Sequence, residues 1–160
     1  MLDLTLSDRL TPQLDAAIKA CLDFGPVMAV IADYMRSETV QRFDDQAGPD
    51  GRRWQPSQRA IADGGLTLTD SGELRLSITA DSDATSAVAG TNKLYAAIHQ
   101  FGGTIRGKAG AGGRRRALNT PFGPRASVTM PARPFLGFSD ADAGHIEGLL
   151  ADHIRDAFGA

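Results

Sequence analysis

The chain has 160 residues, a net charge of −2 at pH 7, a hydrophobic content of 42% and a charged content of 22%. These values are typical of one soluble globular domain, which at this length buries about 70% of the surface that the unfolded chain exposes. So small a net charge argues against a protein that binds nucleic acid over its whole surface. No apolar run approaches the roughly 20 residues of a membrane-spanning helix, so we expect no membrane contact.

Two consecutive helices are predicted at the N-terminus. Thr11 reads as an N-cap and Pro12 as a first helical residue, and apolar residues then recur at helical spacing up to Gly25. Gly25 and the proline after it end one helix and can begin another. The predicted helices span about 12–24 and 26–44, and a single kinked helix is the alternative.

Cys21 is the only cysteine, which excludes an intrachain disulfide. It lies on the apolar stripe of the first predicted helix, where we expect a small core residue rather than a reactive thiol. The first residues lack the basic start and the apolar core of a secretion signal. We therefore expect a protein that is made and kept in the reducing cytosol.

The sequence GPDGRRWQP, residues 48–56, predicts a tight turn after the helices. Pro49 fixes φ, Asp50 can accept a hydrogen bond from the chain that follows, and Gly51 can take a positive φ. Trp54 is the only tryptophan, and beside such a turn we expect it to be a packing anchor.

Residues 57–63 predict a short helix, and a pair of strands follows. From Leu74 to Ala80 apolar and polar residues alternate, and this period of two is typical of a half-buried strand. The sequence ATSAVAG, residues 84–90, predicts an antiparallel partner, joined to the first strand by a turn at 81–83.

The remaining elements follow in order. The sequence YAAIHQFGG, residues 95–103, predicts a short helix that ends at two glycines, and strands are predicted at 103–106 and 126–130. Ser139 predicts the N-cap of a last helix, which has an apolar stripe and ends at Gly159.

The predicted fold class is α+β in a single domain, residues 1–160. Its parts are helices at about 12–44, a small antiparallel sheet with a long basic, glycine-rich loop within 66–138, and a C-terminal helix at 139–158. Helices at both ends with short strands between them are the arrangement of this class.

Charge is distributed unevenly along the chain. Residues 102–125 contain six cations and no carboxylate, so the rest of the chain carries a net charge of −8. The cations are Arg106, Lys108, Arg114, Arg115, Arg116 and Arg125. We call residues 106–116 the basic loop. The sequence therefore predicts a basic loop on an acidic body.

Three interpretations of the basic loop stay open. It can be a mobile, solvated segment, because glycine loses more conformational entropy on ordering than any other residue. It can contact DNA, since clustered Arg and Lys neutralise phosphates without reading the sequence. It can also become ordered on the acidic surface of a neighbouring copy of the same protein.

The sequence lacks the common catalytic, zinc-binding and phosphate-binding motifs. The three histidines, His99, His145 and His153, lack the spacing of a zinc-binding HExxH helix, and no serine lies in a GxSxG turn. The stretch GGTIRGKA is close to a phosphate-binding loop, but Ala109 stands where Ser or Thr must bind magnesium. We therefore expect no enzyme activity, no metal and no cofactor. A small hydrolase that uses His99 is the enzymatic alternative.

Four sequence blocks carry a resemblance to a known family. They are RFDDQAGPDGRRWQP, LTDSGELRLSI, AGTNKLYAAIHQFGG and MPARPFLGFSDAD, followed by a terminal helix. Their order and spacing resemble the phage virion morphogenesis family, which includes tail completion and tail assembly proteins of Mu-like and P2-like bacteriophages. The resemblance runs from about Arg42 to the C-terminus, and the N-terminal helices match only in kind.

The resemblance implies a structural, non-enzymatic protein of a tailed bacteriophage or prophage that completes the tail and joins it to the head. It would form a homo-oligomeric ring, with a hexamer as the expected copy number, and contact other tail or head–tail connector proteins and, non-specifically, DNA in the channel. It would be located in the virion, at the tail or the head–tail interface, after assembly in the host cytoplasm. The alternative is a DNA-binding packaging or regulatory module that uses the basic loop.

The resemblance also implies structural roles for the residues of its motifs. Trp54 and the turn before it would fix the chain after the helices, and His99 would tie two strands or loops together through its two ring nitrogens. Phe135 would insert into the core or into a neighbour. The motif positions are Pro49, Asp50, Gly51, Trp54, Tyr95, His99, Gln100, Phe101, Gly102, Pro131, Pro134 and Phe135.

Seven cations are candidates for contact with DNA or with another subunit. Arg133 lies between two prolines, and we expect it to form a salt bridge, either within the chain or to a neighbouring subunit. The full set is Arg106, Lys108, Arg114, Arg115, Arg116, Arg125 and Arg133.

Overall fold

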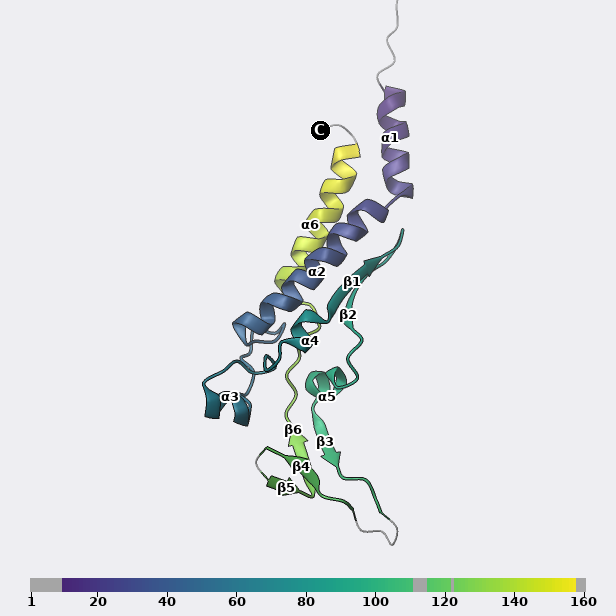
Figure 1. Ribbon diagram of the computed structural model, residues 1–160. Coiled ribbons are helices and arrows are strands. Elements are labelled where there is room, and N and C mark those ends of the chain that lie inside the picture. Colours follow the sequence, from purple (N-terminus) through teal and green to yellow (C-terminus); the bar gives the residue numbers. More distant parts are fainter. Residues whose placement is uncertain (1–9, 111–114, 122, 158–160) are drawn as a thin grey trace, which may run out of the picture. The chain divides into compact units, whose positions relative to one another are not determined.

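The computed structural model describes residues 10–110, 115–121 and 123–157. Helices and short two-stranded sheets confirm the α+β class (Figure 1). The pairs are β1–β2, β3–β6 and β4–β5, so three small sheets replace the single one expected. The elements are α1 (Leu10–Leu22), α2 (Gly25–Asp45), α3 (Gln58–Asp63), α4 (Glu73–Leu76), β1 (Ile78–Ser82), β2 (Ala87–Thr91), α5 (Ala96–Phe101), β3 (Gly103–Arg106), β4 (Leu118–Thr120), β5 (Gly123–Arg125), β6 (Ser127–Met130) and α6 (Asp140–Ala157).

Contacts divide the chain into two compact units. Unit 1 comprises residues 1–37, 79–89 and 138–160, and unit 2 comprises residues 38–78 and 90–137. Both α2 and the β1–β2 pair contribute to each unit. The single domain expected from the sequence remains a prediction.

In unit 1, α6 lies beside the first part of α2 (Figure 1). The Tyr34 hydroxyl donates to Asp142 Oδ1 over 2.9 Å, and the Tyr34 ring centroid is 4.3 Å from that of His145. The two N-terminal helices are separate, as the sequence predicts, with the break at residues 23–24. The side chain of Cys21 lies outside the described part, so its expected burial stays a prediction.

The start of α6 confirms the predicted cap. The Asp142 amide donates to Ser139 Oγ over 3.1 Å, and the Ser139 amide donates to Asp142 Oδ2 over 2.7 Å. This reciprocal pair satisfies two amides that the first helical turn leaves unbonded. Gly159, the expected end of this helix, lies outside the described residues.

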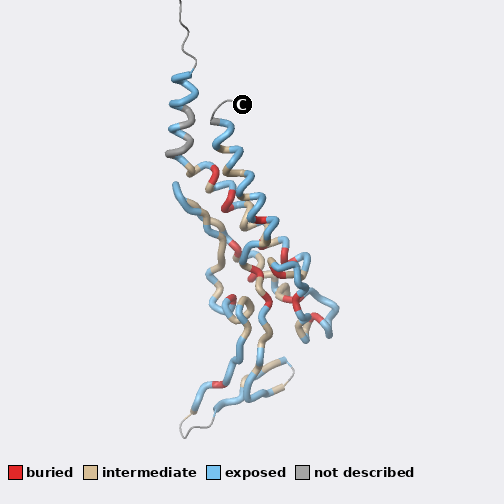
Figure 2. Tube along the Cα trace, turned by 180° about the vertical axis from the view of Figure 1, so that it is seen from behind, coloured by how far each residue is buried: buried red, intermediate tan, exposed pale blue. Residues whose placement is uncertain are grey.

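The core of unit 2 is a small cluster of mostly aromatic and aliphatic side chains. Phe43 and Phe135 are fully buried, and their ring centroids are 5.5 Å apart. The ring of Trp54 meets Phe43 edge to face at 5.6 Å, so the tryptophan packs under the turn as expected. Figure 2 shows buried residues near the end of α2 and in α4, whereas the strands β3, β4, β5 and β6 are more exposed. The cluster consists of Phe43, Trp54, Leu74, Ile78, Ala96 and Phe135.

The turn after α2 is built as its sequence predicts. Gly51 has a φ of +72°, and its amide donates to the carbonyl of Gly48 over 2.9 Å. Asp50 Oδ1 accepts from the Arg52 amide over 3.1 Å. The turn returns the chain to α2, where the Trp54 amide donates to the Gln46 carbonyl.

The strand predicted from residue 74 onward is wrong in its first half. Residues 73–76 form the one-turn helix α4, and the strand begins only at Ile78. Leu74 is buried, whereas Leu76 is 80% exposed, because residues two apart lie on opposite sides of a helix. The Ser71 hydroxyl accepts from the Glu73 amide, which favours helix over strand at this point.

The turn between β1 and β2 lies two residues later than predicted. The Asp83 amide donates to the Ser86 carbonyl, and Asp83 Oδ1 accepts from the amides of Thr85 and Ser86. The bond from the Thr85 amide is the main reason that the pKa of Asp83 lies below its ordinary value. The carboxylate therefore fixes the turn, and the partner strand β2 begins at Ala87, three residues after the expected start at residue 84.

We expect Phe135→Ala to lower the free energy of unfolding by about 3–5 kcal/mol, because it leaves a cavity in a core of few side chains. Phe101 is 79% exposed, so Phe101→Ala should change it by less than about 0.5 kcal/mol. Urea unfolding of the two variants tests this, and equal losses would contradict the placement of Phe135.

Candidate functional site

Residues 131–137, which we call the strap, follow β6 and lie in no helix or strand of the described chain. Pro131 and Pro134 lie within it, and neither has a backbone N–H that could join a strand ladder. A buried backbone without a partner strand must satisfy its amides and carbonyls elsewhere. In the strap, side chains from distant parts of unit 2 do this.

Gln100 of α5 makes three of these contacts. Its Oε1 accepts from the amides of Phe135 and Leu136 over 3.0 and 3.1 Å, and its Nε2 donates to the Leu136 carbonyl over 2.8 Å. The side-chain amide thus replaces a partner strand for two consecutive residues.

Two further side chains bind strap carbonyls. Nη1 of Arg42 donates to the carbonyls of Phe135 and Gly137 over 3.0 and 2.8 Å, and Arg42 is almost fully buried. Nε1 of Trp54 donates to the Pro134 carbonyl over 2.9 Å. Arg42 was expected only as the start of the first sequence block, and no spacing in the sequence indicates this role.

Gly102 allows α5 and the strap to approach closely. It has a φ of +69°, and a Cβ atom there would lie 2.7 Å from the Ala132 nitrogen. Gly103 also has a positive φ, and β3 begins at this residue directly after α5. Only glycine fits at Gly102 without moving the strap.

The motif residues around His99 are only partly packed together. Tyr95 is 42% exposed and Phe101 is 79% exposed, and among the described residues His99 Nδ1 is buried without a hydrogen-bond partner. The backbone carbonyl of His99, rather than its ring, holds the neighbouring segment by accepting from the Arg133 amide over 2.7 Å. The prediction that both ring nitrogens tie segments together is therefore wrong.

Arg133 is the most buried cation of the candidate set. It is 4% exposed, and its Nε donates to the Gln55 carbonyl over 2.7 Å. Within residues 10–110, 115–121 and 123–157 no carboxylate forms an ion pair with it, so the expected internal salt bridge is absent there. Burial lowers the pKa of Arg133 from its ordinary value. The guanidinium remains charged without a counter-charge.

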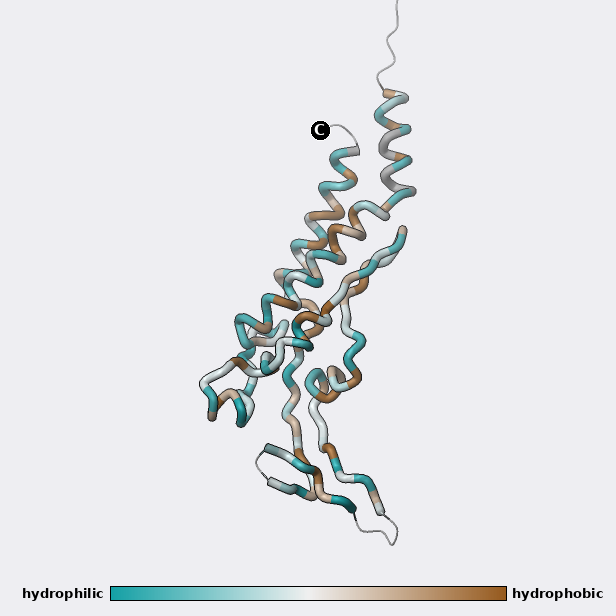
Figure 3. The backbone as a smooth tube through the Cα atoms, in the orientation of Figure 1, coloured by the Kyte–Doolittle hydropathy of each residue, from teal (hydrophilic) through white to brown (hydrophobic). Residues whose placement is uncertain are grey.

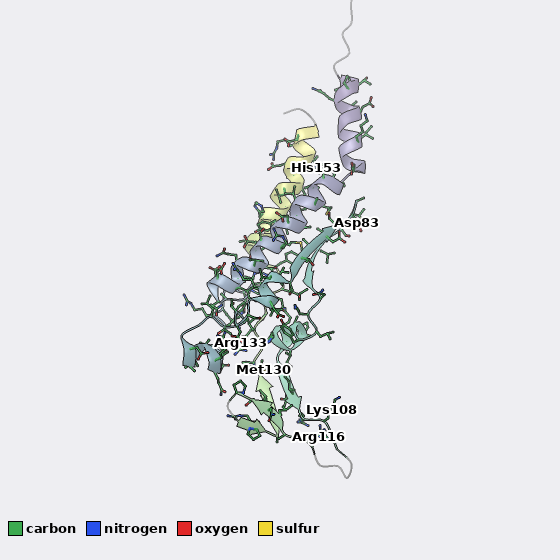
Figure 4. All side chains as sticks on the ribbon, in the orientation of Figure 1. Asp83, Lys108, Arg116, Met130, Arg133 and His153 are labelled. Carbon is green, nitrogen blue, oxygen red and sulfur yellow. The ribbon has the colours of Figure 1, made fainter. Side chains whose placement is uncertain are left out.

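A cavity of about 600 Å³, which we call the arginine pocket, lies beside the strap in unit 2. Arg59, Arg125 and Arg133 line it together with apolar and uncharged polar side chains, and none of its described lining residues is Asp or Glu. Arg59 is partly neutralised, since its Nε lies 3.5 Å from Asp70 Oδ1. Figure 4 shows Arg133 next to Met130 of the same pocket. The apolar lining includes Pro56, Ile105, Leu118, Val128, Met130 and Pro131.

The described ends of the basic loop are paired rather than free. β3 pairs antiparallel with β6, and beyond β3 the Arg116 amide donates to the Lys108 carbonyl over 2.9 Å. Figure 4 shows Lys108 and Arg116 side by side. A Cβ atom at Gly107 would lie 1.6 Å from the Arg116 carbonyl oxygen, so this glycine permits the pairing. Arg114 lies outside the described residues.

The other loop cations are exposed. Arg106, Lys108, Arg115, Arg116 and Arg125 all lie at the surface of unit 2. Sequence reasoning missed the β4–β5 hairpin, which brings Arg125 to the pocket. Its strands have only three residues each, too few for an alternating pattern.

Charge divides sharply between the two units. Unit 1 has twelve carboxylate residues and four cations, which give a net charge of −8. Unit 2 has seven carboxylate residues and thirteen cations, which give a net charge of +6. The acidic body and basic loop expected from the sequence thus correspond to an acidic unit and a basic unit.

Comparisons with known proteins agree with this picture. The model of the phage virion morphogenesis family matches residues 7–155. The chain belongs to this family. Its role therefore lies in the assembly of phage virions.

Two relatives are similar over most of their length. The chain is 31% identical to "Mu-like prophage FluMu G protein 2" of Haemophilus influenzae, over 98% of this chain and 94% of the relative. It is 34% identical to "Putative capsid assembly protein G" of Escherichia phage Mu, over 80% of this chain and 78% of the relative. No solved structure shows a significant match.

The described part of the chain contains no group of three or more His, Cys, Asp or Glu residues that could hold a metal ion. No helix within it is long and apolar enough to cross a membrane.

We expect Gln100→Met to lower the free energy of unfolding by about 3 kcal/mol, because a side chain of similar length removes three hydrogen bonds to the strap. Gln13→Met, at an exposed position of α1, should change it by less than about 0.5 kcal/mol. Denaturant unfolding measures both. A Gln100→Met protein as stable as the parent would show that the strap does not depend on this amide.

His99 should make stability depend on pH. Burial, and next the charge of Arg133, lower the pKa of His99 below its ordinary value of 6.5, so the unfolded chain binds the proton more readily. The contribution of neutral His99 to the free energy of unfolding should be fully present above about pH 6.5 and should decline as the pH falls further. Between about pH 7 and about pH 5, His99→Gln should lose less stability than the parent. Identical slopes for the two proteins would contradict this.

Proposed function

We propose that the protein acts in tail completion and head–tail joining of a tailed phage or prophage, by forming a homo-oligomeric ring with a hexamer as the expected copy number. Membership of the phage virion morphogenesis family supports an assembly role. The observation that carries the ring is the opposite net charge of the two units within one chain. The proposed location is the tail or the head–tail interface of the virion.

Opposite charges favour a head-to-tail contact between copies. When unit 2 of one copy, at +6, meets unit 1 of the next, at −8, each subunit offers both halves of the contact. Such heterologous contacts close into rings when the rotation between neighbours permits. Complementary charge also guides encounter and selects the orientation.

Exposed apolar side chains in unit 2 support a partner surface. Leu94 is 98% exposed and Phe101 is 79% exposed. Figure 3 shows hydrophobic residues in and just before α5, where both residues lie. Single exposed apolar residues are ordinary, but aromatic and aliphatic residues this exposed on one short segment favour a contact with other virion proteins.

The name of the phage Mu relative, a putative capsid assembly protein, supports a function in building the particle. Non-enzymatic assembly also fits the described part of the chain, where strap and core give Trp54, Gln100 and Phe135 structural roles.

A DNA-binding module is the second candidate. Residues 102–125 carry six cations and no carboxylate, a composition that neutralises phosphates. The paired ends of the basic loop present Lys108 and Arg116 side by side.

We expect light scattering to give a ring-sized mass for the parent protein at about 0.05 M salt and a smaller mass at about 0.5 M salt, where charges are screened. Replacing Lys108 and Arg116 with Glu should give the 16.9 kDa monomer at both salt concentrations. Arg52→Glu with Arg53→Glu, at exposed positions outside the loop, should behave as the parent. A parent protein that is monomeric in every condition would contradict the ring, and loss of DNA affinity with an unchanged mass would favour the DNA-binding module.

A further inference from the structure

The arginine pocket contains a charge that forms no ion pair with any described residue. Arg133 is 96% buried, and neither Nη1 nor Nη2 has a hydrogen-bond acceptor within residues 10–110, 115–121 and 123–157. A buried charge is costly unless it is paired. Because arginine cannot release its proton, an anion that entered the cavity would balance this charge.

The pocket lining indicates what kind of anion fits. Arg125 at the surface and Arg133 at depth form no ion pair with any described residue, and both line the cavity. Between them the wall includes Ile105, Val128 and Met130. A carboxylate on an aliphatic side chain can meet the guanidinium while its methylene groups contact the apolar wall. A bare phosphate chain could bind uncharged polar side chains of the lining, such as Ser127 and Thr129, but it has no methylene groups to pack on the apolar wall.

Helix α6 of unit 1 presents such carboxylates. Asp140 and Glu147 are exposed, form no ion pair with any described residue, and lie seven residues apart, so they share one face of the helix. Gly144 lies between them, and nothing would lie within 4 Å of a Cβ atom there. An exposed glycine inside a helix costs about 1 kcal/mol relative to alanine, and its small size lets another surface come close. We call Asp140, Gly144 and Glu147 the acidic face.

We propose that the arginine pocket binds the acidic face of α6 from a second copy of this protein. This inference rests on the proposed ring and names its contact: a carboxylate of one subunit balances Arg133 of the next, and Arg125 binds at the rim. The contact joins the −8 unit of one copy to the +6 unit of the other. Since the pocket and the acidic face lie on different units, every subunit can offer its acidic face to one neighbour and its pocket to another at the same time.

Two complementary variants test the proposal in the full-length protein. The first, Asp140→Asn with Glu147→Gln, removes the charges of the acidic face and keeps the pocket. The second, Arg125→Glu, blocks the pocket and keeps the acidic face. Arg125 is exposed and has no ion-pair partner in the described residues, so its replacement spares the strap and the core. Each variant alone should be monomeric, and an equal mixture should form a dimer of twice 16.9 kDa that cannot grow further.

Matched controls alter the same number of charges elsewhere. Arg52→Glu changes an exposed cation of unit 2, and Asp15→Asn with Asp81→Asn removes two exposed carboxylates of unit 1. Both control proteins should form an assembly of the same mass in solution as the parent protein.

Other results would overturn the proposal, and they separate it from the ring itself. If both test variants form parent-sized rings, the ring stands and the pocket contact is wrong. If the parent is monomeric, ring and contact fail together. If the mixture stays monomeric and Arg125→Glu alone loses affinity for a fluorescent DNA duplex, the pocket is a nucleic-acid site.

Discussion

The fold of unit 2 depends on how the strap satisfies its backbone. Residues 131–137 cross the core without a partner strand, and burial makes each unbonded amide or carbonyl costly. The side chains of Gln100, Arg42 and Trp54 bind this backbone from three separate segments, between 35 and 95 residues away. Phe135 can then fill the centre of the core against Phe43. Polar contacts thus position the segment, and aromatic packing supplies the apolar burial that stabilises it.

The same constraint creates the arginine pocket. Because the Arg133 amide bonds to the His99 carbonyl and Nε bonds to the Gln55 carbonyl, the guanidinium is held beneath the surface. Strand β6 leads directly into this position, and its pairing with β3 supplies the apolar wall. A charged group is therefore fixed at the wall of a cavity, where burial without an ion pair opposes local stability.

Separate charges on separate units suit a protein that assembles. A net charge of −2 gives little long-range repulsion between copies, whereas units of −8 and +6 attract each other in one orientation. Surface charge of this kind controls association rate and orientation, while close packing of side chains controls how long the contact lasts. The exposed residues Leu94 and Phe101, just before and within α5, provide apolar surface for such close packing.

The sequence by itself determined the helices, the turn at 48–56, the cap at Ser139 and the family, because each depends on residues a few positions apart or on the order of motifs. It failed at residues 73–76, where alternation predicted a strand and local hydrogen bonds favoured a helical turn. Only the tertiary structure decided that Gln100 rather than the ring of His99 holds the strap, and that Arg133 lies in a pocket with Arg125. The contacts that hold the strap and the side chain of Arg133 join residues tens of positions apart, and which partners meet depends on how the whole unit packs rather than on any local spacing.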